Sequence, residues 1–234
     1  YWLHNNMVTV DGQKMGKSLN NFITLKQAFI DWPEPKHERL NRKYDSLAVR
    51  QLILNSHYRS PIDFSDAALS AAQSGYEKIV GAVIAVRRRW NTAPSGQIDP
   101  ALEGEIKQLR GKFENAMNDD LNTAVALSVI FELVRLADGL LADANVTKEM
   151  LNEIDKAFRN LGGDVLGLVK ETYASEQITA AEYERLSRIV GNLIEERNKA
   201  RKQKNFAAAD VIRSVLSSDI VLEDKPEGTQ WRWK

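Results

Sequence analysis

The sequence predicts a mainly α-helical protein: an antiparallel helical bundle, preceded by a short hairpin and loop and followed by a small α+β module. Three observations predict this fold class. Apolar residues recur at three- and four-residue spacing over most of residues 65–161, as one face of an amphipathic helix requires. Capping and turn residues divide this stretch into lengths typical of bundle helices. Near the C-terminal end, the apolar period changes to the two-residue alternation of strands.

The composition is that of a globular protein. The chain has 234 residues, 43% hydrophobic and 27% charged, enough for one large domain or two ordinary ones. Its 32 basic and 32 acidic residues cancel, so any contact with a polyanion must come from local patches. Cysteine is absent, the three histidines have no ligand-like spacing, and no apolar run approaches the roughly 20 residues of a membrane span. A protein of the cytoplasm without a membrane partner is expected.

The first segment predicts a hairpin that leads into a basic loop. Residues 7–10 are partly β-branched, and Asp11-Gly12 is a strong two-residue turn signal. The following loop, Lys14-Met15-Gly16-Lys17-Ser18, carries two lysines three positions apart. Such lysines can neutralise the phosphates of a bound nucleotide, and a solvated basic turn is the alternative.

Four helices are expected to form the bundle, and local signals mark where each begins. The apolar face of the first is expected to run from Leu69 to Trp90, and that of the third from Val125 to Leu140. The start signals are Ser65 or Asp63, Asp99-Pro100, residues 119–123 and Thr147, and Gly162-Gly163 is expected to end the fourth helix.

A separate module is expected after a linker at residues 170–177, which lack periodicity. Thr179 and Glu182 form a capping-box pattern that opens a helix running toward Arg201, and Asn205 is expected to cap a shorter helix. Alternation at residues 220–223 and 229–233 predicts a terminal hairpin.

Four separated motifs then suggest a family. They are residues 11–22 (DGQKMGKSLNNF), 55–65 (NSHYRSPIDFS), 117–124 (MNDDLNTA) and the segment 193–234. In this order they resemble the cysteinyl-tRNA synthetases, which are class I aminoacyl-tRNA synthetases, and the resemblance covers essentially the whole chain. The first motif resembles the KMSKS signature, a loop that closes over ATP in that family. Gly16 stands where serine is usual, which removes a hydroxyl and adds backbone freedom.

The resemblance implies two sets of binding residues. ATP contact would fall on Lys14, Met15, Gly16, Lys17 and Ser18, with Lys17 as the best candidate. Anticodon contact would fall on Arg201, Phe206, Asp210 and Asp224, where Phe206 replaces a common tryptophan.

The residues themselves suit anticodon recognition, because splayed bases require cations, a stacking surface and hydrogen-bond acceptors. The cations would come from a basic run between Arg197 and Lys204, the stacking surface from Phe206 and the acceptors from the two aspartates. The alternative is a solvated helix face with Phe206 in the core.

The two middle motifs have both functional and structural interpretations. By resemblance, His57 and Arg59 would contact the inner elbow of the tRNA. Alternatively, Tyr58 and Phe64 pack while Arg59 pairs with an acid. The 117–124 motif is expected to cap a helix and to have no catalytic role.

The implied domains are 1–30, the end of a catalytic domain with the nucleotide loop; 31–170, a connecting segment and the bundle; and 171–234, an anticodon-binding module. Residues 31–43 are longer and more charged than the usual link, which predicts an insertion or surface loop. The family's zinc site and its other nucleotide motif would lie before Tyr1. No complete catalytic set and no metal site are therefore expected in this chain, which alone is expected to be inactive.

The implied parent enzyme activates cysteine with ATP and transfers it to tRNA(Cys), as a monomer. It would use ATP with Mg²⁺ as well as Zn²⁺, and none of these is expected to bind stably to this chain. Two alternatives are a ligase that joins cysteine to a small-molecule amine and a stand-alone tRNA-binding module. The module at 171–234 argues against the small-molecule ligase, because such an acceptor has no anticodon.

Overall fold

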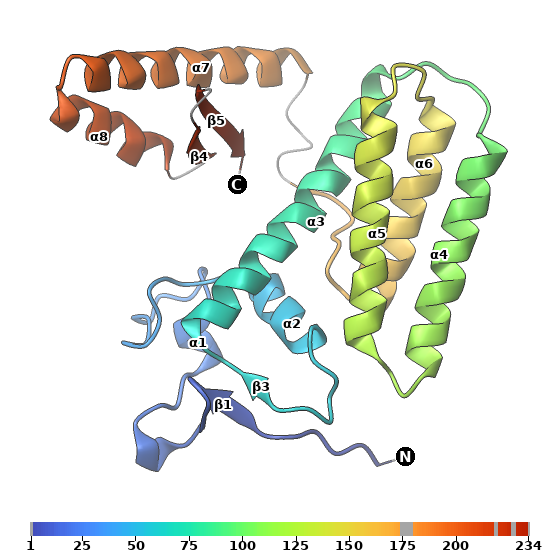
Figure 1. Cartoon of the computed structure of the whole chain (residues 1–234), viewed down its shortest axis with the longest axis vertical. Coiled ribbons are helices and arrows are strands. Elements are labelled where there is room, and N and C mark those ends of the chain that lie inside the picture. Colours follow the sequence, from blue (N-terminus) through green and yellow to red (C-terminus); the bar gives the residue numbers. More distant parts are fainter. Residues whose placement is uncertain (1, 174–179, 218–219, 226–227, 234) are drawn as a thin grey trace. The chain divides into compact units, whose positions relative to one another are not determined.

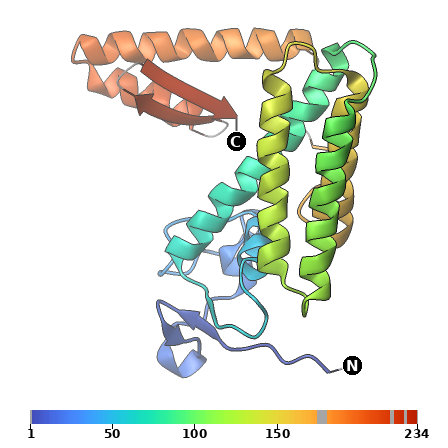
Figure 2. The same cartoon turned by 45° about the vertical axis from the view of Figure 1, so that its right-hand side comes forward.

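The computed structural model describes residues 2–173, 180–217, 220–225 and 228–233. Of residues 180–184, 221, 223–225, 228, 230, 232 and 233, only the backbone is described. The chain forms two compact units, Tyr1–Tyr173 and Ala174–Lys234. The predicted mainly α fold is confirmed, because helices make up most of the described chain (Figure 1, Figure 2).

The first unit is built around four long helices, and consecutive helices run in opposite directions (Figure 1). Helix α3 packs on α5 and α6, and α4 packs on α5. Their shared core contains fully buried aliphatic side chains such as Ile79, Ile130, Leu133 and Ile154. The bounds are α3 Asp66–Thr92, α4 Pro100–Asn118, α5 Thr123–Ala142 and α6 Lys148–Ala157.

Side-chain oxygens start these helices where the sequence predicts. The backbone N–H of Ala68 donates to Ser65 Oγ over 3.3 Å, so Ser65 is the cap of α3 and Asp63 is not. Asp99, Asn122 and Thr147 accept equivalent bonds at the starts of α4, α5 and α6. Each cap satisfies a backbone donor that the first turn of a helix leaves unpaired.

The predicted end of the fourth helix at Gly162-Gly163 is wrong. The chain continues after α6 in π-helical turns, η2 Phe158–Val165, and Gly167 (φ 65°) is the left-handed residue. A Cβ on Gly162 would lie 2.8 Å from Val169 Cγ2, and one on Gly163 would lie 3.0 Å from the Val169 carbonyl oxygen. The two glycines therefore permit the close approach of the returning chain.

Before the bundle lies a small three-stranded sheet with the order β2-β1-β3. Strand β1 pairs antiparallel with β2 and parallel with β3. Its buried Val10 packs with Ile23 and Phe64 in a second core cluster. The elements of this region are β1 Val8–Val10, β2 Gln13–Lys14, η1 Lys17–Leu19, α1 Leu25–Ala28, α2 Ser46–Leu54 and β3 Ile62–Asp63.

The expected surface loop at residues 31–43 contains no helix or strand. An isolated β-bridge between Phe29 and Tyr44 joins the two flanks of this loop, and the buried side chain of Leu40 anchors it. Tyr44 is buried, and its hydroxyl donates to the backbone carbonyl oxygen of Asp66 over 3.1 Å. Burial together with the carboxylate of Asp66 raises the pKa of Tyr44 to about 12.

The second unit contains two helices and a hairpin, as predicted. Its core joins Val190 and Ile194 to Leu216 and Ile220. A three-residue turn connects the helices: the N–H of Asn205 donates to the carbonyl of Ala200, and Lys204 is left-handed (φ 59°), as in a Schellman motif. The bounds are α7 Ala180–Lys202, α8 Phe206–Leu216, β4 Ile220–Lys225 and β5 Gly228–Trp233.

Candidate functional site

The predicted nucleotide loop is an exposed loop on a tight hairpin. Asp11 (φ 51°) and Gly12 (φ 77°) are both left-handed, which matches the twist of a two-residue hairpin turn. After β2 the chain turns through the 3₁₀ helix η1. Lys14, Lys17 and Ser18 are exposed, whereas Met15 and Gly16 are half-buried. Lys17 Nζ lies 5.6 Å from the centroid of the Phe22 ring.

Asn21 holds the loop from the inside. It is 1% exposed, and its side chain bonds the first and the middle residue of the loop. Asn21 Oδ1 accepts from the Gly16 N–H over 2.8 Å, and Asn21 Nδ2 donates to the Lys14 carbonyl over 3.0 Å. This residue fixes the loop backbone while both lysine side chains stay in solvent. The sequence predicts no role for Asn21, and its only signal there is a polar residue inside the motif.

The backbone freedom that glycine adds at position 16 is not used. Gly16 is extended, with φ −165° and ψ 144°, a conformation open to any residue. A Cβ there would lie 3.9 Å from Leu19 Cδ1, an ordinary contact. The usual serine would fit this backbone.

Asp63 ties the hairpin turn to β3. Its Oδ1 accepts from the Gly12 N–H over 3.0 Å and from Thr9 Oγ1 over 2.8 Å. The bond from the Gly12 N–H lowers the pKa of Asp63 and outweighs the opposing effect of partial burial. The ionised carboxylate therefore supports the base of the loop.

The second and third motifs meet in a polar junction. Tyr58 Oη donates to Asp120 Oδ1 over 2.7 Å, Arg59 Nη2 lies 3.0 Å from Asp120 Oδ2, and His57 Nε2 lies 3.2 Å from the Asp120 carbonyl. This supports the structural interpretation, in which Arg59 pairs with an acid. The carbonyls of Tyr58 and Arg59 accept from Asn6, so the junction also anchors the segment that leads into β1.

Two of the four predicted anticodon residues flank the turn between α7 and α8. Arg201 belongs to the last turn of α7 and Phe206 to the first turn of α8, and both are exposed. Phe206 is 60% exposed, so the alternative that places it in the core is wrong. Asp210 follows one helical turn later and is also exposed. Asp224 belongs to β4, but its side chain lies outside the described residues.

The basic run is less continuous than the sequence suggests. Arg197 is only 3% exposed, and its Nη1 donates to Asn198 Oδ1 over 3.4 Å, the oxygen that also accepts from Thr229 Oγ1. Arg197 therefore belongs to the interior of the module. Lys199 Nζ lies 2.8 Å from Glu196 Oε1, which offsets its charge. Arg201, Lys202 and Lys204, which precede Phe206 in the chain, are also exposed.

Neither a cluster of metal-ligating side chains nor a membrane-spanning helix is present among the described residues. In the described ranges, no group of three or more metal-ligating side chains is present, so these residues supply no ligand set for the zinc that the resemblance implies. No helix in the same ranges is both long and apolar enough to span a bilayer.

Two family descriptions match separate parts of the first unit. The description "tRNA synthetases class I (C) catalytic domain" matches residues 1–74, which include the loop and the polar segment of Tyr58. A DALR domain matches residues 112–170, which lie in the bundle.

Curated relatives match the chain from end to end. The cysteine–tRNA ligase of Bacteroides fragilis is 36% identical over 234 residues, which are 99% of this chain and 45% of that protein. Those of Chlorobaculum tepidum and Halalkalibacterium halodurans are 39% and 38% identical and cover 100% and 99% of the chain. The chain spans about 45% of the length of these relatives. Because the matches include the C-terminal module, the small-molecule ligase is not favoured. The chain belongs to the cysteine–tRNA ligase family.

Proposed function

We propose that this chain supplies the nucleotide loop and the tRNA-binding elements of an enzyme that activates cysteine with ATP and esterifies tRNA(Cys). The observation that carries the proposal is the loop itself. Asn21 braces its backbone, and two lysines project from it into solvent. A cation that is already in position stabilises the negative charge that develops on the phosphates in the transition state. It lowers the activation barrier because no group has to move first.

In this proposal Lys17 and Lys14 neutralise the phosphates of ATP while cysteine attacks and pyrophosphate leaves. Lys17 is the stronger candidate, because it opens η1 at the tip of the loop, whereas Lys14 still belongs to β2. Met15, Gly16 and Ser18 shape the loop around the nucleotide. When bound, Mg²⁺ would add positive charge at the phosphates, and Zn²⁺ would bind the cysteine thiol elsewhere in the enzyme.

We also propose that the second unit binds the anticodon. Phe206 offers a face on which a splayed base can stack, Arg201 offers a guanidinium, and Asp210 and Asp224 accept from base amino groups. The enzyme acts as a monomer in the cytoplasm, where its tRNA is found. Residues 1–30, 31–170 and 171–234 then correspond to the nucleotide loop region, the connecting segment with the bundle, and the anticodon-binding module.

Substitution of Lys17 in the full-length enzyme tests the nucleotide proposal. Lys17→Ala should lower the rate of cysteine-dependent ATP–pyrophosphate exchange about a hundredfold or more, as the loss of a single transition-state donor does. Lys112→Ala removes an exposed lysine of α4 that pairs with Glu132, and it should leave the exchange rate unchanged. Equal rates for Lys17→Ala and the wild type would rule out the assigned role.

A further inference from the structure

A basic and aromatic cluster lies on the bundle, on helices that carry neither the nucleotide loop nor the predicted anticodon residues. Near its end, α3 carries three consecutive arginines followed by Trp90. The chain has no net charge, so this run is a local concentration of positive charge. Sequence periodicity predicted that Trp90 would continue the buried face of α3, but this prediction is wrong. Trp90 is 44% exposed, although Val86 before it and Ala93 after it are buried in the core of the bundle.

Trp90 forms one wall of a groove between α3 on one side and α6 with the start of η2 on the other. The floor is apolar and consists of buried Val86 and Leu151. The amide of Asn152 also lines the groove, whose volume is about 240 Å³. This volume is below the roughly 300–1,000 Å³ of pockets that enclose whole drug-sized ligands. The groove can therefore accept one planar ring system, but the rest of a larger ligand must stay outside.

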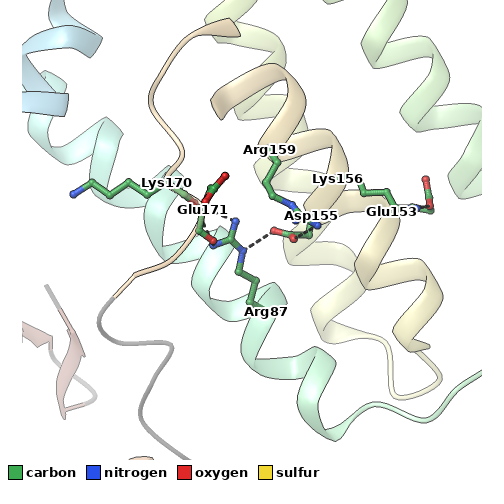
Figure 3. Close-up of polar contacts among 7 residues, drawn as sticks. All are labelled: Arg87, Glu153, Asp155, Lys156, Arg159, Lys170 and Glu171. Atoms are coloured by element: carbon green, nitrogen blue, oxygen red, sulfur yellow. Dashed lines mark hydrogen bonds and ion pairs between the residues drawn. The ribbon is translucent and has the colours of Figure 1, made fainter. Parts of the chain in front are cut away.

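Charged side chains that pair with one another also line the groove. Figure 3 shows Arg87 on α3 pointing toward Asp155 on α6, with Arg159 beside the same carboxylate. Arg87 Nε lies 2.7 Å from Asp155 Oδ1, and both side chains are 13% exposed. Arg87 also donates to the carbonyls of Lys170 and Glu171, so its role here is structural.

The accessible cations lie at the rim. Arg159 Nη2 lies 3.0 Å from Asp155 Oδ2, yet its side chain is 46% exposed and can reach a ligand in solvent. Lys148 does not line the groove itself, but its Nζ lies 4.9 Å from the centroid of the Trp90 ring. Asp155 is the one carboxylate among the groove-lining residues, and it faces the two guanidinium groups. The rim therefore favours an anion next to an aromatic wall.

We propose that this groove binds an unpaired base of RNA, with the base against Trp90 and its phosphates on Arg159 and Lys148. Single-stranded nucleic acids are bound by this combination, because every base has a face that can stack and every nucleotide carries a phosphate. Asn152 can hydrogen-bond the base edge. The proposal rests on the proposed function, since an RNA ligand is expected of a protein that aminoacylates tRNA.

The aromatic wall is tested first, by measuring dissociation constants of the full-length enzyme for tRNA(Cys). Trp90→Ala should weaken binding about five- to hundredfold, the range for loss of one stacked base. Trp90→Phe keeps a smaller ring and should lose less. Because Trp90 is not part of the buried core cluster of the bundle, both variants should melt close to the wild type. If both variants bind tRNA(Cys) as the wild type does, the proposal is overturned.

The cationic rim predicts a different signature. Arg159→Gln should weaken binding of all RNAs alike and should reduce the salt dependence of log K by about one phosphate contact. Lys156→Gln is the matched control, because it removes the same charge from α6 at a residue that does not line the groove. An unchanged salt slope in Arg159→Gln, or an equal change in Lys156→Gln, would contradict the assignment of the rim.

Competition experiments separate an RNA base from a free nucleotide. A short single-stranded RNA should compete with tRNA for the wild type and less for Trp90→Ala, whereas the same sequence in a duplex should not compete at this groove. Competition by adenosine or cytidine monophosphate alone, lost in Trp90→Ala while tRNA affinity is unchanged, would replace the RNA site by a mononucleotide site.

The same measurements separate this proposal from the proposed function. A wild-type enzyme that discriminates anticodons through Arg201, but whose Trp90 and Arg159 variants bind normally, would overturn the groove assignment alone. A wild-type enzyme without affinity for tRNA would overturn both.

Discussion

At the scale of single residues, the loop depends on a side chain that contacts no ligand in the proposed mechanism. Asn21 bonds the backbone at the start of the loop, at Lys14, and at its middle, at Gly16. Without these bonds, the two lysines would sample many positions, and the phosphates of ATP would lose a preorganised partner. Asn21 is therefore a positioning residue.

Asn21→Ala should lower the free energy of unfolding by about 1–2 kcal/mol, because a buried side chain is truncated and two backbone groups lose their partner. It should also lower kcat/KM for ATP in pyrophosphate exchange. Wild-type ATP kinetics in Asn21→Ala would show that the brace does not position the lysines.

At the scale of elements, the hairpin and β3 are joined through one carboxylate. Asp63 accepts from both Gly12 and Thr9, and its pKa is lowered in the folded state. A group with a lowered pKa stabilises the fold above its unfolded pKa, which is about 4 for aspartate. That stabilisation is lost as the pH falls through the lower pKa of the folded state.

The difference in unfolding free energy between the wild type and Asp63→Asn should therefore be constant near neutral pH and should shrink below about pH 4. Denaturant titrations at a series of pH values measure this difference. If the difference in unfolding free energy stays the same down to pH 2, the carboxylate charge does not support the hairpin.

The elements also show which sequence signals are dependable. Caps such as Ser65, Asp99 and Thr147 were predictable because a cap is a bond between residues two or three apart. Gly162 was misinterpreted because its neighbour, Val169, comes close only after the chain returns. Contacts between residues that are close in the sequence can be predicted from it, whereas the approach of a distant segment cannot.

At the scale of the whole molecule, the fold class and the family were predictable, because helical periodicity and four ordered motifs extend over the chain. The burial and exposure of individual residues were less predictable. Trp90 and Arg197 each fit a pattern, one apolar and one basic, yet Trp90 is exposed and Arg197 is buried. Periodicity identifies a helix face but not the length over which another element covers it. The candidate loop was found from sequence, and its brace and the groove on α3 were not.

Anticodon recognition by the second unit tests the central claim most directly. The measurement is the dissociation constant of the 234-residue protein for tRNA(Cys) and for the same tRNA with an altered anticodon. Changing the anticodon should weaken binding about tenfold or more, and Arg201→Ala should have a similar effect and remove the discrimination, as expected for a lost charged hydrogen bond. Arg188→Ala, an exposed arginine about 20 Å earlier on α7, should bind as the wild type does. Equal affinity for both tRNAs, or an Arg201→Ala variant indistinguishable from Arg188→Ala, would contradict the account.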